Sequence, residues 1–482
     1  MGFEIKPGEK PHLLIALGLL VLALLSRFYG IAEWHIVGDE YFTAFYSHER
    51  YTSFINQAYY ALVVLTYSIF GDAEWLSRLP ALIIGVLSIP VLYISWSRVV
   101  GKNAALFAAL ILVFSAWHLW FSQYARFYIG VFLFSSLAYY FFYSAVIQDR
   151  VSYLALALAC SLIAIMFHAT AILVPASCVV AYLVMFILLK GSIEGPSKVI
   201  KIYLGVSILI VIPALVFFLE KVLSTWLALE QTWGHGPLMI LPQTVKYIQL
   251  PIVATALFGW FLLLRHNKLM AVFFAIGIGV PLVLMMIASS RMSVRPDYVF
   301  YILPLVIVLS GIACEAVSQA MVRSKYAAHV LLVTVIICLL PSFISHYTAK
   351  KSLRFEEVVS FVEKNFQKDD QILSFLNGFN LYADKEYKLL PFISFERDKR
   401  ENWQQALDPL MESHSRVWFV ISSKRAPLAP ELDKWLYCNA RLVWQKHARR
   451  MDYEVDGYQV YLASQATRNS QDISGCTKLA AK

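Results

Sequence analysis

The chain has 482 residues, of which 59% are hydrophobic and only 15% are charged, and its formal net charge is +9. Soluble domains carry charged residues at about one position in four, so this composition excludes an ordinary soluble protein and indicates a polytopic membrane protein. Much of the excess Lys and Arg lies in short loops between apolar runs, where it sets membrane topology. The positive charge therefore does not predict nucleic-acid binding.

Apolar runs of about 18–22 residues predict about eleven transmembrane helices. The runs are 12–32, 76–97, 103–120, 125–147, 151–168, 170–190, 200–220, 244–264, 269–290, 297–320 and 327–347. No small-residue cleavage site follows the first run, so we expect it to be an uncleaved span. Alternate loops are basic, which predicts a cytoplasmic N-terminus and an extracytoplasmic C-terminus. Their cations are Lys6, Lys10, Arg98, Lys102, Arg150, Lys190, Lys198, Lys201, Arg265, Lys268, Arg323 and Lys325.

Two outer loops contain candidate functional residues. The first, 33–77, has apolar residues at amphipathic spacing and is predicted to form two helices lying in the membrane interface. Asp39 and Glu40 in this loop follow the first span directly, and carboxylates are costly so close to hydrocarbon. They are either a helix N-cap or a catalytic base at the membrane surface. The loop 221–247 contains Trp233 and His235 among glycines; it is either a mobile element over a cavity or an ordinary interfacial aromatic loop.

After residue 347 the composition becomes that of a soluble domain. Helical and strand patterns alternate, which predicts an extracytoplasmic α/β domain over 348–482 with a partly parallel sheet. Its strands are expected at 371–375, 417–421, 441–444 and 458–462, and helices near 355–366 and 403–411. The domain could shape the entrance to the membrane cavity or hold an acceptor. Cys438 and Cys476 lie in it and could pair in an oxidising compartment, whereas the other four cysteines lie in apolar runs.

Five basic residues oppose the topological bias by lying at the outer interface. They are Arg78, Arg126, His168, Arg291 and Arg295. A single arginine at a span end commonly reaches lipid phosphates by snorkelling. Four arginines beside a carboxylate pair instead predict a site for an anionic group, because the guanidinium fork binds two phosphate oxygens and keeps its charge. We expect the substrate cavity to be lined by Tyr128, His168, Tyr298, Tyr301, Trp233 and His235.

The chemistry that fits these groups is sugar transfer from a lipid-linked sugar phosphate. A polyprenyl phosphate leaves as a weak base, so it needs charge stabilisation rather than a general acid. The acceptor hydroxyl needs a base, which a carboxylate can supply. One base and one stabilised leaving group imply direct displacement with inversion at the sugar carbon.

Four stretches resemble a known superfamily. They are Gly38-Asp39-Glu40, Ser77-Arg78-Leu79-Pro80-Ala81 running into Gly85, the segment from Ser115 to Tyr128 that contains Ser122-Gln123-Tyr124-Ala125-Arg126-Phe127-Tyr128, and Arg295 to Pro304. In this order they resemble the GT-C membrane glycosyltransferases, and most closely the bacterial relatives of dolichyl-phosphate-mannose–protein mannosyltransferase, a group that includes the lipid A aminoarabinose transferase. The resemblance covers about residues 10–320. Tyr124 departs from the family pattern, in which Glu is common.

The resemblance implies a GT-C fold over 1–347 and a polyprenyl-phosphate-linked sugar donor, used on the periplasmic face of a bacterial inner membrane. Asp39 would be the base, Glu40 would orient the acceptor or the base, and Arg78, Arg126, Arg291 and Arg295 would bind the donor phosphate. Some relatives bind a divalent metal. No second carboxylate pair is placed to complete a metal site, so we expect metal-independent catalysis. The sugar stays open, and so does the acceptor, which could be a protein, a glycan, lipid A or another lipid.

Two other classes are compatible with the composition. A polysaccharide polymerase or O-antigen ligase also uses lipid-linked donors, but lacks the Asp-Glu pair directly after the first span. A transporter or lipid flippase would usually show internal repeats and charges at the membrane midplane. The sequence has no internal repeat, and its unusual charges lie at one interface.

Overall fold

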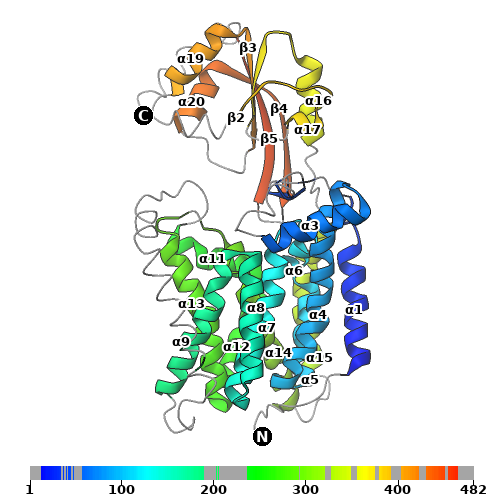
Figure 1. Cartoon of the computed structure of the whole chain (residues 1–482), viewed down its shortest axis with the longest axis vertical. Helices are drawn as coiled ribbons and strands as arrows, with labels where there is room; N and C mark the ends of the chain where they lie inside the picture. Colours follow the sequence, from blue (N-terminus) through cyan, green and yellow to red (C-terminus); the bar gives the residue numbers. More distant parts are fainter. Residues whose placement is uncertain are drawn as a thin grey trace. The chain divides into compact units, whose positions relative to one another are not determined.

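The computed structural model describes most of the chain. The described residues are 12–33, 36, 39–40, 42–44, 47, 57–188, 202, 205, 236–292, 294–320, 327–348, 355–374, 379–391, 403–422, 430–450 and 454–464. They form two compact units, one of Met1–Ala32 with Gly38–Tyr347 and one of Glu33–Val37 with Thr348–Lys482 (Figure 1). The predicted span at 200–220 and the loop residues Trp233 and His235 lie outside the described residues.

The first unit is helical. Its elements are α1 (Leu13–Phe28), α3 (Gln57–Phe70), η1 (Glu74–Arg78), α4 (Leu79–Val100), α5 (Lys102–Phe114), α6 (Ala116–Ser122), α7 (Tyr128–Gln148), α8 (Val151–Phe167), η2 (Ala169–Ile172), α9 (Leu173–Leu188), α11 (Pro237–Ile248), α12 (Leu250–His266), α13 (Lys268–Ala288), η3 (Pro296–Ile302), α14 (Leu303–Ala320) and α15 (Ala327–Thr348). Within the described residues, six helical segments are long and apolar enough to cross a membrane, or up to eight if each of two bent helix pairs is one span. The expected number of eleven stays a prediction.

Two of the predicted spans, 103–120 and 244–264, contain a sharp bend that the apolar pattern did not show. Helices α5 and α6 meet at a 67° bend, and α11 and α12 at a 98° bend. The first bend falls at Ser115, which is extended and accepts a hydrogen bond from the backbone N–H of His118, so that it caps α6. The second falls at Gln249, whose φ of +80° ends α11, and Pro251 lies in the first turn of α12.

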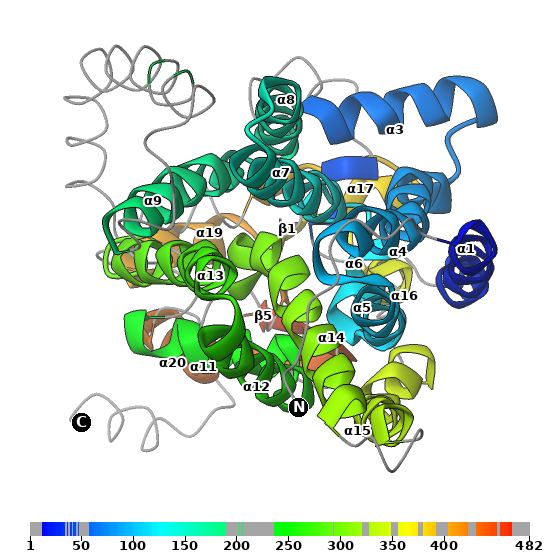
Figure 2. The ribbon, with the colours of Figure 1, turned by 90° about the horizontal axis from the view of Figure 1, so that it is seen from below.

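Helix α14 lies inside the helical unit. It packs against α5 and α12, and Figure 2 shows it between them, with α1 at the edge of the bundle. Glycine permits this close packing: a Cβ at Gly311 would collide with the carbonyl of Ala104, and one at Gly259 with the carbonyl of Leu309. Small residues let membrane helices approach in this way.

Chain reversals gather the described residues of the predicted site at one end of the helical unit. Helices α3, α6 and α11 lie at this end in Figure 1. Helix α1 ends here, α4 and α7 begin here, and η3 contacts both α7 and η2. Residues as far apart in the sequence as Asp39 and Tyr298 are therefore found at the same end of the helical unit.

The second unit contains a five-stranded sheet of order β2-β1-β3-β5-β4, in which β2, β1 and β3 are parallel and β5 is antiparallel to β3 and β4. The strands are β1 (Asp370–Ser374), β2 (Leu389–Pro391), β3 (Arg416–Ser422), β4 (Ala440–Arg450) and β5 (Glu454–Ser464). Alternate residues of β3 enter two cores, Val417 and Phe419 on one face and Trp418 and Val420 on the other. The helices of this unit are α16 (Phe355–Asn365), α17 (Phe379–Tyr382), α19 (Trp403–Ser413) and α20 (Pro430–Asn439).

The cysteines differ between the two units. Cys438 in α20 is disulfide-bonded, and its predicted partner, Cys476, lies outside the described residues. Cys160, Cys178, Cys314 and Cys338 of the apolar helices are free.

Candidate active site

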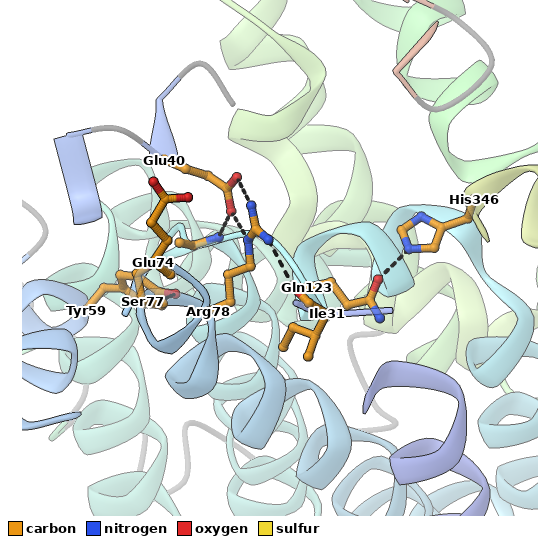
Figure 3. A network of polar contacts seen from close by, with 9 residues as sticks. Ile31, Glu40, Tyr59, Glu74, Ser77, Arg78, Gln123 and His346 are labelled. Carbon is orange, nitrogen blue, oxygen red and sulfur yellow. Dashed lines mark hydrogen bonds and ion pairs between the residues drawn. The ribbon is translucent and has the colours of Figure 1, made fainter. Parts of the chain in front are cut away.

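Glu40 and Arg78 form a buried ion pair (Figure 3). Arg78 donates from Nε to Oε1 and from Nη2 to Oε2 of Glu40, each over 2.8 Å. Its Nη1 donates to the carbonyl of Ile31 over 3.0 Å. Both side chains are fully buried, and a charge buried in a membrane protein needs this kind of pairing.

The residues around Arg78 explain why it has this position. Arg78 ends η1, and Pro80 in the first turn of α4 favours a new helix start. The hydroxyl of Ser77 donates to the carbonyl of Glu74 over 2.7 Å, and the hydroxyl of Tyr59 in α3 donates to the carbonyl of Ser77 over 3.0 Å. Helix α3 therefore holds η1, and η1 directs Arg78 toward Glu40.

The turn between α6 and α7 connects to both acidic residues. The backbone N–H of Ala125 donates to Oε1 of Glu40 over 2.7 Å. The next residue, Arg126, donates from Nη1 to the carbonyl of Asp39 over 3.3 Å and contacts the hydroxyl of Tyr60 at 3.4 Å. Its Nε is buried and has no hydrogen-bond partner within the described part of the chain. Arg126 thus lies beside Asp39, and its Nε–H can still donate a hydrogen bond to a ligand.

Aromatic rings extend the site from Arg126 toward η3. The guanidinium of Arg126 lies 4.5 Å from the ring centre of Phe127. Phe127 stacks on His168 at 4.7 Å, and His168 stacks on Tyr298 at 5.4 Å. Tyr128 also contacts His168, at 5.7 Å, and lies within electrostatic range of Arg126 and Arg295. The predicted cavity residues Tyr128, His168 and Tyr298 are therefore brought together around Arg126.

The other predicted site residues differ in their surroundings. Arg295 forms an ion pair with Asp297 at 2.9 Å while remaining partly exposed. Tyr301 is buried, and its hydroxyl has no partner among the described residues. Arg291 is exposed and makes none of the side-chain contacts that connect the described arginines of the site. Asp39 is partly buried.

Sequence reasoning missed a second buried cation. Arg27 in α1 is fully buried and donates to the carbonyls of Leu112 and Val113 at the end of α5, over 3.1 and 2.8 Å. Its Nη2 also lies 3.2 Å from Nδ1 of His118. A cation at the C-terminal end of a helix is favourable, so Arg27 stabilises the bend between α5 and α6. The sequence signal was an arginine inside the first apolar run, which is rare within a span.

Gln123 and His346 also carried no predicted role. The Gln123 carboxamide is buried and hydrogen-bonds to the end of α1 and to His346 in α15 (Figure 3). Gln123 belongs to the quoted signature from Ser122 to Tyr128, but its partners come from distant elements and leave no local pattern.

The described residues do not fit a divalent metal. No group of three His, Cys, Asp or Glu side chains comes together within them, and both carboxylate oxygens of Glu40 accept from Arg78. We therefore derive no catalytic step through a metal.

Fold and site together define a multi-helix membrane protein with a carboxylate pair after its first helix, a buried arginine partner and an arginine-bearing turn. A family model described as dolichyl-phosphate-mannose-protein mannosyltransferase matches residues 58–217. A sequence search of characterised proteins found no match.

Three solved structures are similar over nearly the whole chain. ArnT from Cupriavidus metallidurans in the apo state is 16% identical, with a TM-score of 0.58, and the alignment covers 95% of this chain and 98% of that one. The same protein bound to undecaprenyl phosphate is 15% identical, with a TM-score of 0.55 and coverage of 95% and 99%. The Archaeoglobus fulgidus oligosaccharyltransferase in complex with Zn and sulfate is 13% identical, with a TM-score of 0.57 and coverage of 88% and 68%. The chain has the fold of these proteins, which is the fold that the sequence motifs implied.

Proposed function

We propose that this protein is an integral-membrane glycosyltransferase that moves a sugar from a polyprenyl-phosphate donor to an acceptor. One observation carries the proposal. Arg126 donates to the carbonyl of Asp39 while its Nε has no partner among the described residues. A cation able to take an anionic ligand therefore lies beside the backbone of the residue whose carboxylate would act as base. The family match and the similarity to a structure bound to undecaprenyl phosphate support this donor class.

Arg126 and Arg295 are the cations we assign to the donor phosphate. As the bond between the sugar carbon and the phosphate oxygen breaks, the electron pair stays on the phosphate and a second negative charge develops. Guanidinium groups held in place stabilise that charge without reorganising. Arg78 has a different task in this proposal, because Glu40 and the carbonyl of Ile31 already occupy its donors.

Asp39 is the proposed catalytic base. Its carboxylate takes the proton of the acceptor hydroxyl as the acceptor oxygen forms the new bond to the sugar carbon, and the polyprenyl phosphate leaves from the opposite face. This single displacement inverts the sugar carbon. Glu40 is the proposed positioning residue for this site, since its carboxylate accepts three hydrogen bonds from Arg78 and Ala125.

The stacked rings of Phe127, His168 and Tyr298, with Tyr128 beside them, would line the path to the reacting carbon. The basic alternate loops support placing this end of the bundle on the extracytoplasmic side of a bacterial inner membrane. Mass spectrometry of glycolipids and glycoproteins from cells with and without the gene would identify the sugar and whether the acceptor is a protein, a glycan or a lipid.

Asp39→Asn is the mechanistic test. In purified protein supplied with the identified donor and acceptor, we expect turnover to fall by roughly 10²- to 10⁴-fold, the usual contribution of general base catalysis. Binding of polyprenyl phosphate should stay within about 2-fold, since the guanidinium groups are unchanged. The matched control is Asp149→Asn at the other end of α7, where Asp149 has a φ of +48° that Asn also tolerates.

Normal turnover by folded Asp39→Asn protein would show that Asp39 is not the base. Movement of intact donor across a proteoliposome membrane, with no sugar transferred, would instead identify a transporter.

A further inference from the structure

Gln123 connects three helices at the proposed active site. Its Nε2 donates to the carbonyls of Arg27 and Tyr29 over 2.6 and 2.8 Å, and its Oε1 lies 2.6 Å from Nε2 of His346 in α15. Gln123 is fully buried and His346 nearly so. The Gln123–His346 contact, drawn in Figure 3, lies beside the ion pair of Glu40 and Arg78.

The partners fix the orientation of both side chains. Backbone carbonyls can only accept, so the two N–H groups of the Gln123 carboxamide must point at Arg27 and Tyr29. The Oε1 atom then faces His346, which must donate from Nε2. The contact is therefore a directed hydrogen bond that a residue of similar shape without an N–H could not replace.

The same bonds hold the end of α1. Carbonyls in the last turn of a helix have no intrahelical partners, and Gln123 satisfies the carbonyls of Arg27 and Tyr29. Two residues later, the carbonyl of Ile31 accepts from Arg78. Two side chains of the site thus anchor the backbone from Arg27 to Ile31 at the end of α1.

Gln123 is also the first residue of the turn that carries Arg126. Helix α6 ends at Ser122 and α7 begins at Tyr128, so Gln123 holds one side of the turn while the bond from Ala125 to Glu40 holds its middle. A displacement of Gln123 would move Arg126, three residues on, relative to Asp39.

We infer that Gln123 and His346 are positioning residues: their hydrogen bond ties α15 to the turn and holds the Arg126 guanidinium where it meets the donor phosphate. The inference rests on the donor-binding role of Arg126 in the proposed function. Simple core stabilisation is the alternative, because a fully satisfied buried polar pair also adds to stability.

A double-mutant cycle distinguishes positioning of Arg126 from simple core stabilisation. The variants are His346→Phe, which keeps an aromatic ring for the contacts with Trp120 and Tyr347, and Arg126→Ala. The measurement is the Kd of purified full-length protein for undecaprenyl phosphate in nanodiscs. We expect His346→Phe to weaken binding by roughly 3- to 10-fold, within the range of coupling between contacting groups. It should weaken binding no further in the Arg126→Ala background.

The controls lie on the same helix. His329→Phe makes the same exchange near the start of α15, at an exposed position beside Phe107, and should leave Kd unchanged. His346→Gln restores an N–H donor and should recover binding to within about 2-fold of the unsubstituted protein. If His346→Phe does not give monodisperse protein, Gln123→Met removes the same bond from the other side and takes its place in the cycle.

Each result is decisive. If His346→Phe weakened binding of undecaprenyl phosphate by the same factor with and without Arg126→Ala, the inference would be overturned. His346 would then have only a stabilising role, and the proposed function would still stand. The same holds if His346→Phe binds normally and Arg126→Ala binds weakly. Normal binding by Arg126→Ala would overturn the assigned role of Arg126 and the inference with it.

Discussion

Glu40 and Arg78, 38 residues apart, share two parallel hydrogen bonds of 2.8 Å at a site closed to solvent. The backbone N–H of Ala125 adds a third bond to the Glu40 carboxylate. This one carboxylate therefore joins the segment after α1, the start of α4 and the turn between α6 and α7. The acid next to it, Asp39, is thereby held beside Arg126.

The ion pair should be essential for stability. Breaking a buried pair by removing one charge usually costs about 3–5 kcal/mol, because the other charge is left uncompensated. We expect Glu40→Gln and Arg78→Met each to lower the unfolding midpoint in detergent strongly, and the double variant to recover part of the loss. Asp39→Asn should unfold near the midpoint of the unsubstituted protein. A Glu40→Gln protein as stable as the unsubstituted one would show that the pair does not hold the site together.

Arg126 should control use of the donor. A hydrogen bond to a charged group contributes about 1.5–3 kcal/mol, so Arg126→Ala should raise the apparent KM for the polyprenyl donor by roughly 10- to 100-fold. Arg126→Lys should recover only part of this, because an ammonium group lacks the planar fork. Initial rates at varied donor concentration measure both.

The matched control for Arg126 is Arg265→Ala. Arg265 lies 4.4 Å from the ring centre of Phe261, as Arg126 lies 4.5 Å from that of Phe127, but it is at the C-terminal end of α12. We expect the apparent KM of the Arg265→Ala protein for the polyprenyl donor to stay unchanged. Arg291→Ala, in the same assay, tests the exposed arginine that the sequence assigned to the phosphate. A large rise in KM for the donor would show that Arg291 also binds the donor phosphate. If Arg126→Ala and Arg265→Ala gave the same KM, Arg126 would be an interfacial arginine that contacts lipid.

Local pattern was sufficient to predict much of the architecture. Apolar runs predicted α13 and α15 within two residues, since burial in lipid requires long apolar helices. The strand expected at 371–375 is β1 at Asp370–Ser374. The bend at Gln249 was missed because apolarity continues through it, and only the backbone conformation shows the break.

The charge pattern marked out several arginines for the proposed site, but it could not predict how each of them is paired. Arg78, Arg126 and Arg291 all oppose the topological bias. Only the tertiary structure shows that Arg78 is internally paired, that Arg126 has donor capacity to spare and that Arg291 is exposed. Arg27 and Gln123 were missed for the same reason, since their partners lie in other helices.

The second unit should lose local stability in acid. Burial opposes ionisation of Asp370, but hydrogen bonds from Arg416, Trp418 and the backbone of Gln367 outweigh it and hold the pKa below its ordinary value. A lowered pKa contributes stability that is fully present above the unfolded-state value of about 3.9 and is lost as the pH falls through the folded-state pKa.

Hydrogen exchange of β1 and β3 amides in the full-length protein, corrected for intrinsic rates, measures this loss. Protection should fall below about pH 4 and should be weaker at neutral pH in Asp370→Asn. Asp369→Asn is the control, because Asp369 is adjacent and exposed. Equal protection in the two variants would show that Asp370 does not anchor β3.

Gly85 should be difficult to replace, because it packs closely against α6 near the proposed site. A Cβ at this position in α4 would collide with the side chain of Ser122 and lie 3.0 Å from its Cα. Ser122 precedes Gln123, so the collision would push the turn that carries Arg126. Overpacking typically costs about 1–3 kcal/mol, and we expect Gly85→Ala to lower both the unfolding midpoint and the transfer rate.

Gly279→Ala in α13 is the control, because it adds the same methyl group with nothing within 4 Å. It should be neutral or stabilise the helix by up to about 1 kcal/mol. Equal midpoints and equal rates for the two variants would mean that α6 can move away from α4 without disturbing the site.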